Sequence, residues 1–199
     1  MHDKIHAEGD DMKGSLKIGL IIIAIIVLVG VTLAGTYNSL VAKSEEVDNK
    51  LADISVQLER RADLIPNLVN TVKGYASHEQ SVIDSVTTAR EKLVNANTLE
   101  EKASANTELT TALNNLFVIL ENYPDLKANT NFIQLQDELA GTENRIAVAR
   151  RDYNEAVKSY NKEIKSFPKN ILARLFGFDK KSYFEAKESS NEVPNVSFE

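Results

Sequence analysis

The stretch Ile18–Ala34 (IGLIIIAIIVLVGVTLA) decides the architecture of this 199-residue chain, because it holds no charged residue and almost no polar one. At about 1.5 Å of rise per residue a helix over this stretch covers roughly 25 Å, and the neutral flank 35–42 can lengthen it. The hydrocarbon layer of a bilayer is about 30 Å thick. We therefore predict a transmembrane anchor over residues 18–36, with Ile18–Ala34 in contact with the lipid bilayer.

A cleaved signal peptide is the main alternative to an anchor. Its apolar region usually has about 7–15 residues and ends at a small-residue cleavage site. The run here is longer, and no A-x-A site follows it, which favours an uncleaved anchor. The positive-inside rule leaves the orientation open, because similar numbers of lysines flank the span. Three precede it (Lys4, Lys13 and Lys17) and two follow it closely (Lys43 and Lys50).

The composition excludes several classes of protein. With no cysteine, the chain cannot form disulfides, use a catalytic thiolate or bind metal through cysteine. The net charge is −6 and no basic stripe interrupts the acidic background, which argues against nucleic acid as a partner. Only 8 Gly and 4 Pro are present, fewer than a loop-rich or all-β chain needs.

Beyond the anchor, apolar residues recur three, four or seven positions apart, which is typical of helices that bury one face. Pro66 interrupts this pattern, because proline disfavours helix in the preceding residue and lacks a backbone donor. We predict that one helix ends near Asp63 and that Asp63 caps the next, which covers Ile65–Asn95. The chain should then reverse direction over residues 63–66.

Further signals delimit the remaining helices. Thr98 and Glu101 form an S/T-x-x-E capping box at the predicted start of the third helix, which ends before Tyr123. We expect a loop over residues 125–130. The last long helix starts near Phe132 and ends at Pro168, with apolar residues three or four positions apart throughout.

Four helices of roughly 23 to 35 residues, joined by short turns, are typical of an antiparallel up-and-down bundle. We therefore predict an all-α fold with a single N-terminal transmembrane helix followed by an antiparallel up-and-down bundle of four long helices. Four segments are expected. Residues 1–17 form a flexible tail, 18–36 the anchor, 37–167 the bundle, and 168–199 a short amphipathic segment with a polar tail.

Several longer motifs run from the anchor almost to the C-terminus. They are Tyr37–Val41, Val56–Val69, Val72–Ala76 with His78-Glu79, Phe132 with Leu135–Leu139, Gly141–Ile146 with Ala149-Arg150, Phe167-Pro168, Phe176–Phe178 and Tyr183-Phe184. In these motifs the chain resembles the LemA family. A longer tail before the span is the departure from the family pattern.

The resemblance implies a bacterial inner-membrane protein with one N-terminal span and a helical bundle. It implies no settled biochemical activity. For members of the family a small tail outside the cell has been suggested, which would put the bundle in the cytoplasm. Relatives associated with magnetosomes and with membrane stress suggest scaffolding roles.

No constellation of residues points to catalysis. His78-Glu79 begins an H-E-x-x-H pattern, but its second histidine is replaced by Val82. The Glu-x-x-His motif of di-iron bundles does not occur. We therefore predict no catalytic residue, no metal ligand, no cofactor and no small-molecule substrate.

Glu79 falls between apolar positions of its predicted helix. One interpretation is a partly buried polar cluster that fixes helix register, in which Glu79 meets Arg60, Arg61 or Arg145. The alternative is that Glu79 lies at the edge of the seam and extends to water.

The segment after Pro168 has two interpretations as well. Ile171, Leu172, Leu175 and Phe176 share one helical face with basic residues around it, which suits an interfacial helix on a membrane. The same residues could instead cap the open end of the bundle.

These observations favour a membrane-tethered scaffold or adaptor whose bundle recruits another protein or a second copy of itself. The alternatives are a membrane-remodelling or lipid-binding protein, and a metal-dependent hydrolase with residues scattered over the helices.

Overall fold

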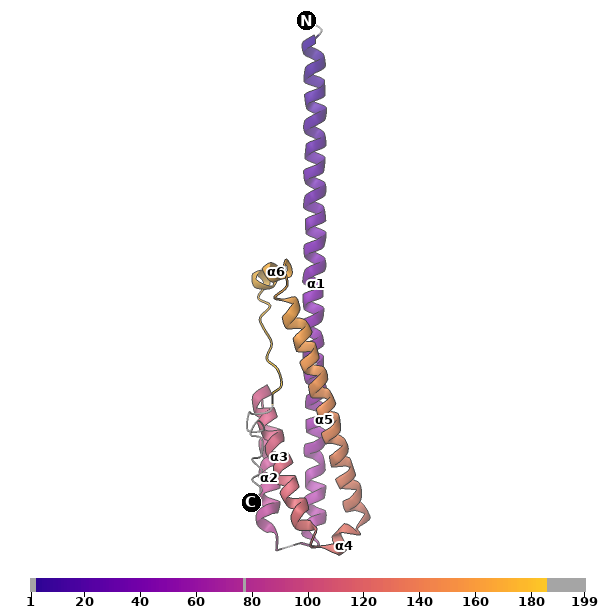
Figure 1. Cartoon of the computed structure of the whole chain (residues 1–199), viewed down its shortest axis with the longest axis vertical. Coiled ribbons are helices and arrows are strands. Elements are labelled where there is room, and N and C mark those ends of the chain that lie inside the picture. Colours follow the sequence, from indigo (N-terminus) through magenta and orange to yellow (C-terminus); the bar gives the residue numbers. More distant parts are fainter. Residues whose placement is uncertain (1–2, 77, 186–199) are drawn as a thin grey trace, which may run out of the picture. The chain divides into compact units, whose positions relative to one another are not determined.

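The computed structural model describes residues 3–76 and 78–185, with side chains from Leu16 onward, and these residues form helices and connections without strands. Figure 1 shows the helices in order. They are α1 (Asp3–Lys73), α2 (Gln80–Asn95), α3 (Leu99–Leu120), α4 (Pro124–Lys127), α5 (Thr130–Glu163) and α6 (Lys169–Phe176). The all-α prediction is confirmed.

The described part of the chain falls into two compact units. One contains the residues up to Glu45 together with Ser159–Lys180, and the other contains Glu46–Lys158 together with the residues from Lys181 onward. Helices α1 and α5 each contribute to both units.

Helix α1 does not end at Asp63, so the predicted helix boundary and the reversal over residues 63–66 are wrong. The helix continues through Pro66 to Lys73, and the described residues 74–76 and 78–79 belong to the connection to α2. Proline lacks the N–H that would bond the carbonyl four residues earlier, which is that of Ala62. Arg90 of α2 donates its Nε hydrogen to this Ala62 oxygen at 2.9 Å. The Ala62 carbonyl therefore has a hydrogen-bond donor, which allows α1 to continue past Pro66.

Contacts in the second unit define the direction of its helices. Along α1 and α5, Arg60 pairs with Glu138, whereas Asp53 lines a groove together with Asp152. Residue numbers thus rise along one helix and fall along the other, so the two run antiparallel.

Helix α3 lies against both α1 and α2. Its Lys102 donates to Ser55 at 3.0 Å and its Asn106 accepts from Arg61 at 2.7 Å, so α3 runs parallel to α1. Helices α2 and α3 pack side by side after a short turn. These contacts confirm the antiparallel up-and-down bundle, formed by α1, α2, α3 and α5, although α2 with its 16 residues is shorter than predicted.

The core of the second unit follows the predicted apolar stripes. Fully or almost fully buried side chains come from α1 (Val47, Ile54, Leu58, Ile65, Leu68 and Val72), α2 (Ile83, Val86 and Leu93), α3 (Leu109, Leu113, Leu116 and Leu120) and α5 (Phe132, Leu139, Ile146, Tyr153 and Val157). Burying such side chains contributes about 1.5–3 kcal/mol each, which makes this seam the main source of stability.

The predicted capping box is present at the start of α3. Thr98 accepts a hydrogen bond from the Glu101 backbone at 3.1 Å, and the Glu101 carboxylate accepts from the Thr98 backbone at 2.9 Å. The segment expected as a loop over 125–130 contains the single turn of α4 instead. Asn129 then caps α5, because its side chain accepts from the backbone of Phe132 at 3.1 Å.

The first unit contains the apolar stretch of α1. Its large apolar side chains from Ile18 to Leu33 are exposed. Within the described residues, α1 is the one helix that is long and apolar enough to cross a membrane. Residues 3–17, expected as a flexible tail, are helical and belong to α1.

The same unit contains the short helix α6. It ends at Gly177, whose φ of 73° is the left-handed conformation that favours glycine at a helix C-terminus. The predicted polar tail beyond Glu185 lies outside the described residues.

Candidate functional site

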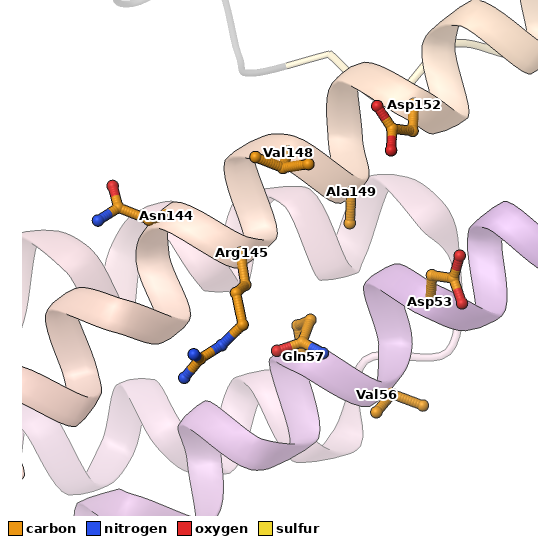
Figure 2. A pocket seen from close by; sticks show the side chains of 8 residues that line it. All are labelled: Asp53, Val56, Gln57, Asn144, Arg145, Val148, Ala149 and Asp152. Carbon is orange, nitrogen blue, oxygen red and sulfur yellow. The ribbon is translucent and has the colours of Figure 1, made fainter.

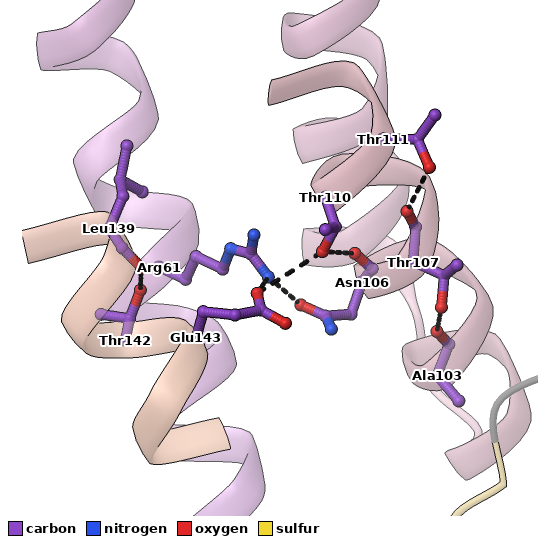
Figure 3. A network of polar contacts seen from close by, with 9 residues as sticks. All are labelled: Arg61, Ala103, Asn106, Thr107, Thr110, Thr111, Leu139, Thr142 and Glu143. Atoms are coloured by element: carbon purple, nitrogen blue, oxygen red, sulfur yellow. Dashed lines mark hydrogen bonds and ion pairs between the residues drawn. The ribbon is translucent and has the colours of Figure 1, made fainter. Parts of the chain in front are cut away.

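A polar cluster lies inside the second unit and joins three helices. Arg61 of α1 is 3% exposed. Its guanidinium forms an ion pair with Glu143 of α5 and donates to Asn106 of α3 at 2.7 Å. Thr110 of α3 also donates to Glu143, at 3.4 Å. Figure 3 shows the Arg61 guanidinium reaching between Glu143 and Asn106.

Burial and pairing act in opposite directions on Arg61. Removal from water lowers the pKa of the guanidinium, whereas the charge and hydrogen bond of Glu143 raise it, and the effect of burial is larger. Arg61 Nε has no hydrogen-bond partner among the described residues. Arg61 is the buried member of this pair, whereas the Glu143 side chain is 41% exposed, and a pair of this kind contributes more to the alignment of α1 with α5 than to net stability.

Arg60 and Arg145 belong to a separate, outer contact. Their guanidinium groups approach the same carboxylate oxygen of Glu138, at 3.0 and 3.7 Å. All three side chains are about half exposed. Exposed pairs of this type contribute about 0–1 kcal/mol, so this contact is a minor one.

Glu79 lies in the connection between α1 and α2, and its contact there is with a tyrosine and not with one of the expected arginines. It accepts a hydrogen bond from the Tyr123 hydroxyl at 2.9 Å. That bond to a carboxylate raises the pKa of Tyr123. The four residues expected in one cluster are therefore distributed over three contacts, one around Arg61, one around Glu138 and one at Tyr123.

Sequence reasoning missed Glu143 as the acidic partner of Arg61. Its neighbour Thr142 is buried on the core face of α5, which turns Glu143 toward the seam with α3. A further signal was Asn106, which falls in the apolar stripe of its helix and is 2% exposed. A polar residue at a core position requires a partner.

A groove of about 430 Å³ runs between α1 and α5 in the second unit. Its lining consists of Asp53, Val56 and Gln57 from α1 and Asn144, Arg145, Val148, Ala149 and Asp152 from α5. Figure 2 shows Asp53 and Asp152 at one end of the groove and Arg145 toward the other. The apolar side chains lie between these charged ends.

Two features of this groove suit binding. Val56 and Val148 are 58% and 48% exposed, although both are β-branched apolar side chains of the bundle. The side-chain oxygen of Gln57 is buried and has no hydrogen-bond partner among the described residues. An apolar floor with charged ends can hold a helix or peptide of complementary charge.

The predicted membrane-contact residues divide between two environments on α6. Leu172 is buried, whereas Ile171, Leu175 and Phe176 are exposed. Among the residues whose side chains are described, 16–76 and 78–185, the His, Asp and Glu side chains form no group of three that could hold a metal ion.

The chain matches the LemA family over residues 50–198, which is most of its length. This protein belongs to the LemA family. The resemblance seen in its motifs is thereby confirmed.

Individual relatives of this LemA-family protein come from three bacteria. Magnetosome protein MamQ 2 of Paramagnetospirillum magneticum is 28% identical over 186 residues, covering 80% of this chain and 68% of the relative. Magnetosome protein MamQ of Magnetospirillum gryphiswaldense is 24% identical with the same coverage. Protein LemA of Metamycoplasma hominis is 28% identical over 158 residues, covering 77% of this chain and 71% of the relative.

Proposed function

We propose that this LemA-family protein is a membrane-tethered scaffold that holds a partner protein at the bacterial cytoplasmic membrane. The observation that carries the proposal is the continuity of α1, which contains both the apolar stretch and a core stripe of the bundle. A binding module whose first helix continues from the anchor is suited to a role at the membrane.

We place the partner in the groove between α1 and α5. Its charges define the ligand, because Asp53 and Asp152 lie at one end and Arg145 toward the other. The occupant we propose is an amphipathic helix of another protein. Its apolar face would cover Val56 and Val148, and it would set a basic residue against the acidic end. The role is binding, without catalysis or a cofactor.

Crosslinking in bacterial cells tests this assignment. A photoreactive amino acid at Val148 should yield an adduct with another protein, whereas the same residue at the exposed Val118 of α3 should not. The crosslinked peptide should have the pattern of an amphipathic helix with a basic residue. Asp53→Lys with Asp152→Lys should abolish the adduct through like-charge repulsion. A homodimeric adduct, no adduct, or one unchanged by the charge reversal would contradict the proposal.

The same proposal includes the location of the bundle. The family resemblance favours the cytoplasmic side, while three lysines before the span against two after it leave the orientation open. Proximity labelling from an enzyme fused after Glu199 should biotinylate cytoplasmic proteins. Labelling restricted to extracytoplasmic proteins would reverse the assignment.

A further inference from the structure

A second groove, of about 300 Å³, lies in the first unit between the end of the apolar stretch and α6. Its lining consists of Leu33, Ala34, Tyr37 and Asn38 from α1 and Leu172, Leu175 and Phe176 from α6. Asn38 is the one lining residue without an apolar or aromatic side chain. The volume is at the lower end of the range for ligand sites, about 300–1,000 Å³.

Aromatic contacts fix the level of α6 along α1. The ring of Tyr37 meets Phe176 edge-on at 5.0 Å between centroids, and Phe178 at 5.7 Å. Tyr37 follows Ala34, the last residue of the apolar stretch, by three residues or about 4.5 Å of helix. Tyrosine at the end of a span is typical of the membrane–water interface. If α1 crosses the membrane as proposed, α6 lies at the level of the lipid headgroups.

The exposure of this segment matches that setting. Phe167 and Leu175 are 81% and 73% exposed. These fractions exceed those of all large apolar side chains in the stretch 18–34, where the highest is 65%, at Val31. Leu172 and Ala173 face inward and are buried, so α6 is docked on its own unit by one side only. Apolar side chains this exposed indicate a surface that is covered by something other than water.

The charge of the segment differs from that of the chain. Residues 159–180 contain five lysine or arginine residues and two acidic ones, whereas the whole chain has a net charge of −6. Arg174 and Lys180 are exposed, and Lys169 forms an ion pair with Glu163. Basic residues beside an apolar face attract anionic lipid headgroups.

We infer that this groove binds an anionic phospholipid of the leaflet at the Ala34 end of the span. One acyl chain occupies the groove, and the basic residues of 159–180 attract the headgroup. The lipid is the occupant because the groove is continuous with the apolar surface of α1 through Leu33 and Ala34. The inference rests on the proposed membrane anchor.

Tryptophan quenching tests the inference and the anchor separately. The chain contains no tryptophan, so each variant has a single reporter. The full-length protein is reconstituted in vesicles of phosphatidylglycerol and brominated phosphatidylcholine, whose bromine quenches tryptophan on contact. Val31→Trp reports on the anchor, Leu175→Trp on α6, and Val56→Trp serves as the control, 22 residues beyond Ala34 in the same helix.

Quenching of Val31→Trp and Leu175→Trp, with Val56→Trp unaffected, is the expected result. Loss of quenching at Val31→Trp would overturn the anchor itself. Quenching at Val31→Trp without quenching at Leu175→Trp would overturn the lipid groove and leave the anchor standing. Equal quenching of all three would also overturn it, because contact would then not be specific to the groove.

Retained lipid tests the groove and the headgroup. Native mass spectrometry of the wild-type protein, solubilised from mixed vesicles, should show bound phosphatidylglycerol in excess over phosphatidylcholine. Ala34→Leu fills the groove and should lose this lipid, whereas the matched Ala24→Leu, in the middle of the span, should keep it. Equal retention by Ala34→Leu and wild type would overturn the site, and equal retention of the two lipids would overturn its anionic preference.

Discussion

Arg90 Nε donates a hydrogen bond, 2.9 Å long, to the carbonyl oxygen of Ala62, which is the oxygen that Pro66 leaves without a helical donor. The two residues are 28 positions apart and belong to different helices. The contact therefore supplies the donor that α1 lacks at Ala62 and also holds α2 against α1.

Arg90→Met should destabilise the bundle through the loss of this bond. A hydrogen bond to a charged group contributes about 1.5–3 kcal/mol, while methionine keeps the apolar stem. In a Pro66→Ala background the helix regains its own donor, so the same substitution should cost clearly less. Denaturant unfolding of the wild type, the two single variants and the double variant gives the coupling energy between Arg90 and Pro66. Arg151→Met, at a 72% exposed side chain, should change stability by no more than about 0.5 kcal/mol. Equal costs in both backgrounds would mean that Arg90 acts without reference to Pro66.

Glu143→Gln should destabilise the protein more than Glu138→Gln. The first change leaves the guanidinium of Arg61 buried without its counter-charge, which costs about 1–3 kcal/mol. The second removes contacts between half-exposed groups, worth about 0–1 kcal/mol. Combining Arg61→Met with Glu143→Gln should recover part of the loss. Thermal unfolding measures these three variants and the wild type, and similar melting temperatures for the two single variants would contradict the central role of Arg61.

The stability contributed by the Tyr123–Glu79 bond should depend on pH in the alkaline range. Because the bond raises the pKa of Tyr123 above its usual value of about 10, the folded state keeps a proton that the unfolded state releases. The contribution is therefore complete below about pH 10 and is lost as the pH rises through the pKa of the folded state. In a tyrosinate absorbance titration, Tyr123→Phe should remove one of the transitions above the usual pKa, and Glu79→Gln should lower the pKa of that same transition. A titration unchanged by Glu79→Gln would contradict the bond.

Gln57→Leu should leave stability unchanged or raise it by up to about 1 kcal/mol. The substitution removes a buried oxygen that lacks a partner and puts apolar surface in its place. Gln136→Leu, at an exposed position of α5, is the control and should have little effect. Chemical unfolding checks both variants. A clear loss of stability for Gln57→Leu alone would show that its oxygen has a partner.

The amino-acid sequence by itself determined the features that depend on neighbouring residues. Charge-free residues from Ile18 to Ala34 define the apolar stretch, because helix rise converts their number directly into length. Apolar spacing of three and four defines the helices and most of their buried side chains. The Thr98–Glu101 capping box was predictable as well, since its two bonds join residues three positions apart.

Only the tertiary structure decided what depends on partners remote in sequence. Pro66 signals a helix end locally, yet a donor from Arg90 in another helix allows α1 to continue. Because α1 continues to Lys73, the reversal comes after that residue. Glu79 therefore lies in a connection and meets Tyr123, while Arg61 meets Glu143. Periodicity gives the face on which a side chain lies, but the pairing of charges across helices depends on their register, and register is fixed only when the whole seam packs.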